Sequence, residues 1–158
     1  MYKRIFYLLF ILSLATFNKS RTFAQQATNN ITIAAPDPLE KNLWYNEEKT
    51  AKIQVYKATD GKFYGKIVWL KEPNKDGKPK TDDKNPDEAR KKDPIIGLLL
   101  LKGFKKDGDM GYNDGTIYDP KNGKTYSCKI TREGDKLDVR GYVGLSLFGR
   151  TTVWTKAE

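Results

Sequence analysis

Apolar and polar residues alternate with a period of two through the last third of the chain. The alternation runs from Tyr126 to Ile130 and again from Leu137 to Val143, and it predicts strands that bury one face each. Asn122-Gly123 precedes the first run and Gly134-Asp135 separates the two, and both pairs supply the positive-φ residues that tight hairpins need. Residues 115–156 are therefore predicted to form an antiparallel meander.

Similar patterns come earlier in the chain. Residues 51–57 and 63–69 alternate around the turn Asp60-Gly61, which predicts a first hairpin. The apolar run 95–101 fits a strand buried on both faces or a short helix, and its length and Gly97 favour the strand. A polar loop is expected over 105–114, before the meander begins. We expect about eight strands, and so an all-β, antiparallel up-and-down barrel, since closure removes exposed sheet edges.

One segment breaks the pattern. Residues 71–94 have no periodicity, carry four prolines and mix acidic with basic residues. Such a long connection is either a functional lid or a disordered insertion. The mixed charge favours a solvated loop over a phosphate-binding arm, so no nucleic-acid partner is expected.

The N-terminus resembles an export signal. Lys3 and Arg4 precede the apolar stretch 5–17, and Thr22-Phe23-Ala24 offers small residues for cleavage after Ala24. We predict a signal peptide over 1–24, a flexible lead over 25–42 and one domain over 43–158, in a protein that is exported to the periplasm or beyond. No stable membrane insertion is expected after cleavage. Loss of 1–24 would remove four of the 29 basic residues and none of the 20 acidic ones, leaving 25 − 20 = +5.

Several ordered motifs resemble the bacterial exported family known as domain of unknown function 2147. They are Tyr64-Gly65-Lys66-Ile67-Val68-Trp69-Leu70, Asp83-Lys84-Asn85-Pro86-Asp87, Ile95-Ile96-Gly97-Leu98, the stretch 115–126, Arg140-Gly141-Tyr142-Val143-Gly144, Phe148-Gly149-Arg150 and Trp154. The resemblance covers nearly all of 43–156. It implies a lipocalin-like (calycin) barrel, in agreement with the strand count, and no known biochemical role.

The resemblance also implies a closing contact. Lipocalin-like barrels commonly begin with Gly, any residue and Trp, whereas this chain has Asn42-Leu43-Trp44. If the likeness holds, Trp44 closes the base of the barrel against Arg150 or Arg140, with a guanidinium stacked on the indole.

The side-chain inventory argues against an enzyme. The chain has no histidine, the usual general base and transition-metal ligand. Cys128 is the only cysteine and shares a strand face with apolar neighbours, so it is expected to be buried and not nucleophilic. Asp82 and Asp83 are interpreted as solvated surface acids. No catalytic residue and no cofactor is predicted.

A calcium-loop spacing in the 71–94 segment is interpreted as coincidence, and no metal site is predicted. Its members would be Glu72, Asn74, Asp76, Gly77 and Asp83. Glu and Asp stand in unusual ligand positions, and Pro79 lies inside the stretch.

Two classes of function remain open. An eight-stranded barrel can hold one small ligand, and this reading predicts a small apolar or amphipathic ligand. The candidate wall residues are Phe63, Ile67, Trp69, Tyr126, Leu137 and Val139. Alternatively, side chains fill the interior, and the barrel is a scaffold that contacts an envelope polymer or a protein. That surface would use Lys102, Lys105, Lys106 and Tyr112. The oligomeric state is left open, as is which face of strand 149–156 points inward.

Overall fold

A computed structural model describes residues 35–158 of the chain. The predicted signal peptide, 1–24, and the first part of the predicted lead lie outside the described residues. Residues 36–158 form one compact unit. Its elements are α1 (Pro38–Lys41), β1 (Leu43–Tyr45), β2 (Ala51–Lys57), β3 (Phe63–Leu70), β4 (Asn74–Lys75), β5 (Lys78–Pro79), the 3₁₀ helix η1 (Glu88–Arg90), β6 (Leu99–Asp107), β7 (Gly111–Asp119), β8 (Lys124–Glu133), β9 (Lys136–Tyr142) and β10 (Gly149–Lys156).

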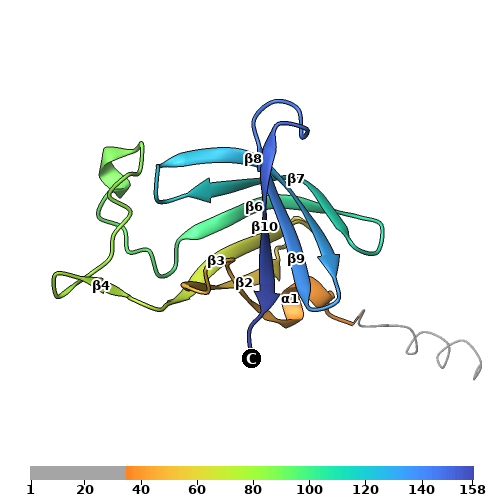
Figure 1. Ribbon diagram of the computed structural model, residues 1–158, viewed down its shortest axis with the longest axis horizontal. Coiled ribbons are helices and arrows are strands. Elements are labelled where there is room, and N and C mark those ends of the chain that lie inside the picture. The colour runs from red at the N-terminus through yellow and green to blue at the C-terminus, as the bar shows by residue number, and fades with distance from the viewer. Residues whose placement is uncertain (1–34) are drawn as a thin grey trace, which may run out of the picture. The chain divides into compact units, whose positions relative to one another are not determined.

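Eight of the strands close into one antiparallel barrel. Their order around it is β1-β10-β9-β8-β7-β6-β3-β2, and β1 completes the ring by pairing with both β2 and β10 (Figure 1). The predicted all-β, antiparallel up-and-down barrel of about eight strands is confirmed. Within residues 35–158, no helix is long and apolar enough to cross a bilayer.

A short helix covers one end of the barrel, which we call the base. Pro38 opens α1, and Asp37 and Glu40 cap it reciprocally through their side chains and backbone amides. Leu39 is completely buried, and the indole Nε1 of Trp44 donates to its carbonyl oxygen at 2.9 Å. The last residues of the segment predicted as a flexible lead are therefore folded onto the barrel.

The same end buries a residue that was expected on the surface. Tyr112 is completely buried, its hydroxyl donates to Asp37, and Lys106 pairs with the same carboxylate. Burial acts to raise the pKa of Asp37, but hydrogen bonds from Lys106 and Tyr112 hold it below its ordinary value. The proposed surface patch of Lys102, Lys105, Lys106 and Tyr112 is therefore wrong in its aromatic member.

The hairpin β6–β7 is longer than predicted. β6 begins only at Leu99, because Gly97 adopts a positive φ of 96° and turns the chain, and it continues to Asp107. The polar stretch 105–114 is mostly strand, with Lys105 paired to Asn113 and Lys106 to Tyr112. Its polar side chains mark an outer face of the barrel that is in contact with water, not a loop.

The long connection between β3 and β6 is ordered. It contains the β4–β5 hairpin and η1, and a bridge between Thr81 and Pro94 closes the loop that carries η1. Asp82, expected on the surface, is completely buried and accepts hydrogen bonds from the Tyr118 hydroxyl at 2.8 Å and from Asn85 Nδ2 at 2.6 Å. Asp82 therefore fastens the connection to β7, a role that a charged loop sequence does not reveal.

Candidate ligand-binding site at the barrel mouth

The interior of the barrel has a filled half next to the base. Mainly apolar side chains from α1 and from most strands meet there with almost no exposure. They are Leu39, Trp44, Phe63, Leu101, Phe104, Tyr112, Cys128, Ile130 and Leu137. The packing is close enough that a Cβ on Gly115 would overlap the ring of Phe104. This half leaves no room for a ligand.

The other half is open. A cavity of about 1610 Å³ extends from the middle of the barrel through the end opposite the base, which we call the mouth, and on along the β3–β6 connection, whose Lys75, Lys78 and Lys92 also line it. Its wall is mainly apolar and includes Ile53, Ile67, Leu100, Ile117, Val139 and Trp154. Ligand pockets usually have volumes of roughly 300–1,000 Å³, so this cavity is large enough for a small molecule.

The predicted wall residues divide between the two halves. Ile67, Tyr126 and Val139 line the cavity. Phe63 and Leu137 are completely buried but do not line it, because they belong to the filled half. A period-two pattern tells which side chains face inward, and it does not tell how far along the barrel the interior is filled.

Trp69 does not line the cavity, in contrast to the expectation from alternation. Lys52 pairs with Trp69 and the next residue, Ile53, pairs with Ile67, so Val68 is an extra residue that reverses the alternation. Trp69 is consequently 38% exposed on the outer wall, edge-on to Tyr45 with ring centroids 6.0 Å apart. Leu70 lines the cavity in its place.

The inward face of β10 is now defined. Arg150, Thr152 and Trp154 all line the cavity, whereas Val153 lies on the outer face, 40% exposed. The indole Nε1 of Trp154 donates to Thr152 Oγ1 at 3.2 Å. Arg150 is thus placed at the mouth, where it can meet a ligand.

The expected closure of the base by an arginine on Trp44 is wrong. Arg150 pairs with Glu47 at the mouth, and Arg140 donates to Ser146 O at 2.8 Å and to Leu147 O at 3.0 Å in the β9–β10 loop. Both arginines sit near the open end of their strands, and Trp44 sits under α1. The base is closed by Leu39 and the helix instead.

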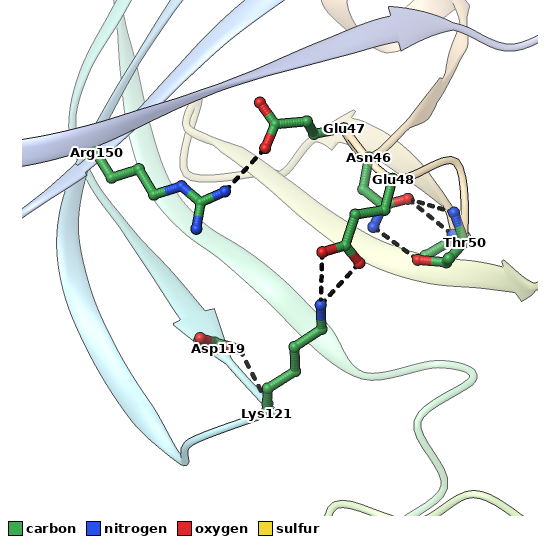
Figure 2. Close-up of polar contacts among 8 residues, drawn as sticks. Asn46, Glu47, Glu48, Thr50, Asp119, Lys121 and Arg150 are labelled. Carbon is green, nitrogen blue, oxygen red and sulfur yellow. Dashed lines mark hydrogen bonds and ion pairs between the residues drawn. The ribbon is translucent and has the colours of Figure 1, made fainter.

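Two ion pairs connect the β1–β2 turn to other parts of the rim. Glu47 pairs with Arg150 at 3.0 Å, and Glu48 pairs with Lys121 of the β7–β8 turn at 2.8 Å (Figure 2). The hydrogen bond from Lys121 holds the pKa of Glu48 below its ordinary value. All four side chains are largely in water, where such pairs contribute little to stability. These contacts are easily exchanged, and no pattern in the sequence points to them.

The remaining candidate chemistry is structural. Burial raises the pKa of the Cys128 thiol to about 12, which leaves it protonated and a poor nucleophile near neutral pH. Asp76 and Gly77, from the calcium-like spacing, form the tight positive-φ turn between β4 and β5. Residues 35–158 contain no group of three or more acidic, cysteine or histidine side chains placed to hold a metal.

A closed eight-stranded antiparallel barrel with an interior cavity open at one end is the architecture of the lipocalin-like class. The structure is similar to that of a protein described as "Protein HP1028 from the human pathogen Helicobacter pylori belongs to the lipocalin family". The TM-score is 0.66 at 20% identity, over 74% of this chain and 82% of that one. No curated protein matches the chain. Residues 42–156 match the family described as "Uncharacterized protein conserved in bacteria (DUF2147)", and the chain belongs to that family.

Proposed function

We propose that this protein is a non-enzymatic carrier that binds one small apolar or amphipathic molecule in the open half of its barrel. The cavity of about 1610 Å³ carries the proposal, because its wall is mainly apolar and it reaches the mouth. An apolar wall in contact with water gains free energy when a ligand covers it, at roughly 25 cal/mol per Å² of apolar surface removed from water.

The mouth suits an amphipathic ligand in particular. Tyr126 and Thr152 line the cavity, and the Tyr126 hydroxyl accepts from Asn122 Nδ2 at 3.1 Å. Arg150 and Lys121 stand further out at the rim. An apolar tail therefore fits the inner wall, and a polar head meets hydroxyl, amide and charged groups near water.

Gly141 offers a direct test of the cavity. Its Cβ position is 3.5 Å from Ile117 Cγ2 and 3.8 Å from Tyr126 Cβ, so Gly141→Phe places a ring in the open half without a backbone clash. Val153→Phe adds the same ring to the outer face of β10 and serves as the matched control. The measurements are mass spectrometry of organic extracts from purified protein and binding of a fluorescent apolar probe.

The carrier proposal expects a stoichiometric small molecule, or tight probe binding, that Gly141→Phe abolishes and Val153→Phe retains. Unchanged probe binding in both variants, with nothing co-purifying, would exclude the carrier and favour the scaffold. Export is part of the proposal and is supported by the sequence of residues 1–24 alone. N-terminal sequencing of protein recovered outside the cytoplasm tests it, and an intact Met1 would contradict it.

A further inference from the structure

The loop between β9 and β10 exposes apolar side chains at the mouth. Val143, Leu145, Leu147 and Phe148 are 70%, 71%, 78% and 70% exposed, respectively. In Figure 1 this loop, drawn in dark blue, projects from the end of the barrel beyond β8 and β10. Single exposed apolar side chains are common on proteins, but four within six residues form an unusual concentration.

The loop is also held in shape by its own polar contacts. Arg140 donates through Nε to Ser146 O at 2.8 Å and through Nη2 to Leu147 O at 3.0 Å. The amide of Phe148 donates to Leu145 O at 3.0 Å. A loop in water does not need internal partners for these groups, whereas a loop that enters an apolar medium does, because an unpaired carbonyl or amide is costly there.

The size and position of this surface decide what it contacts. A stable protein interface takes roughly 20–30 residues from each partner, far more than one short loop supplies. A bilayer surface needs only a few inserted side chains. Val143 and Phe148 also line the cavity, so part of the apolar loop adjoins the opening of the barrel.

The charges at the rim favour a lipid surface only weakly. Lys71, Lys75 and Lys78 line the mouth and have no salt-bridge partner among residues 35–158, and they are available to phosphate groups. Asp76 and Asp83 stand among them. Apolar insertion therefore has to supply most of the binding, with a smaller contribution from anionic lipid.

We propose that the loop of residues 143–148 inserts into the surface of a lipid bilayer and sets the open mouth of the barrel against it. Leu145 and Leu147 enter the acyl region, and Arg150 and the rim lysines lie at the level of the headgroups. An apolar ligand could then pass between bilayer and cavity without crossing water, a consequence that rests on the proposed carrier function. The docking of the loop on the bilayer does not depend on the carrier function.

Flotation with vesicles of phosphatidylcholine, with and without a third of phosphatidylglycerol, tests the docking. We expect the full chain to bind both, and Leu145→Ser/Leu147→Ser to weaken partitioning by about tenfold or more. Met110→Ser is the matched control, because Met110 is 53% exposed on the β6–β7 turn at the base. All of these positions are exposed, so the variants are expected to fold.

A local reporter removes any contribution from the apolar stretch 5–17. After subtraction of the wild-type emission, which comes from Trp44, Trp69 and Trp154, the emission of Leu145→Trp should shift to the blue on vesicles and be quenched by brominated acyl chains, whereas that of Met110→Trp should not respond. The docking is overturned if Leu145→Trp stays unshifted. It is equally overturned if the serine variants, in protein cleaved after Ala24 and so free of the apolar stretch 5–17, bind as the cleaved wild type does, or if the loop instead drives dimerisation without vesicles. Probe binding by the cavity in vesicle-free buffer separates each of these outcomes from failure of the carrier proposal.

Discussion

The base and the mouth of this barrel are built from the same strands but obey different constraints. At the base, α1 covers the end, Leu39 and Trp44 are completely buried, and Asp37 satisfies Tyr112 and Lys106. At the mouth, the cavity meets water, the ion pairs of Glu47 and Glu48 are exposed, and the 143–148 loop presents apolar side chains outward. Free energy of folding is therefore concentrated at one end, which leaves the other end free for binding.

The largest expected effect comes from comparing Trp44, which is buried at the base, with Trp69, which lies on the outer wall of the barrel. Trp44→Ala should lower the free energy of unfolding by about 3–5 kcal/mol, because it opens a void in the filled half and removes the hydrogen bond to Leu39. Trp69→Ala should cost about 1 kcal/mol or less, since Trp69 lies on the outer wall. Urea unfolding measures both, and equal losses would contradict the assignment of Trp44 to the closed end.

The same glycine-to-alanine substitution can be made in the filled half, at Gly115, and in the open half, at Gly141, to compare how tightly the two halves are packed. Gly115→Ala should lower the free energy of unfolding by about 2–3 kcal/mol, because its new methyl group meets the ring of Phe104. Gly141→Ala should change it by less than about 1 kcal/mol, since its nearest neighbours are 3.5 Å and 3.8 Å away. If thermal and urea unfolding found Gly141→Ala the more damaging, the open half would have to be as tightly packed as the base.

The connection beside the mouth depends on one buried carboxylate. Asp82→Ala should lower the free energy of unfolding by about 1–3 kcal/mol, because it leaves Tyr118 and Asn85 without their acceptor. Hydrogen exchange at residues 80–95 should accelerate as well. Asp83→Ala removes the neighbouring exposed acid and should change neither quantity measurably. Slow exchange in Asp82→Ala would show that the connection is held by other contacts.

The smallest expected effect is on how stability depends on pH, and it comes from comparing Asp37 at the base with Glu48 at the mouth. The pKa of Asp37 is lower in the folded state than in the unfolded state, where it is near 3.8. Ionised Asp37 therefore contributes fully to the stability of the fold above pH 3.8, and this contribution is lost as the pH falls through the pKa of the folded state. Asp37→Asn should therefore flatten the fall in stability below about pH 4. Glu48→Gln should hardly alter this profile, because its pair with Lys121 is exposed. Thermal unfolding between pH 2 and pH 6 measures both variants.

The fold was largely predictable from the chain, and the site only in part. Alternation and the Asn122-Gly123 and Gly134-Asp135 turns predicted β9 to within one residue at each end and the central half of β8, because hairpin pairing is local. The outward turn of Trp69 was not predictable, since one bulge at Val68 reverses the pattern. The pattern also could not reveal the exposure of Leu145 and Leu147, because an apolar loop residue is equally compatible with a covered and an uncovered position.

By itself, the sequence predicted a closed antiparallel barrel of about eight strands, since the period of two and the turn residues act over a few neighbouring positions. Only the tertiary structure decided that Phe63 and Leu137 fill the base while Ile67, Tyr126 and Val139 face a cavity. It also decided that Asp82 is an anchor and that Arg150 stands at the mouth. These outcomes depend on which side chains meet across the barrel, and Arg150 and Glu47 are 103 residues apart in the sequence, where no local pattern reaches.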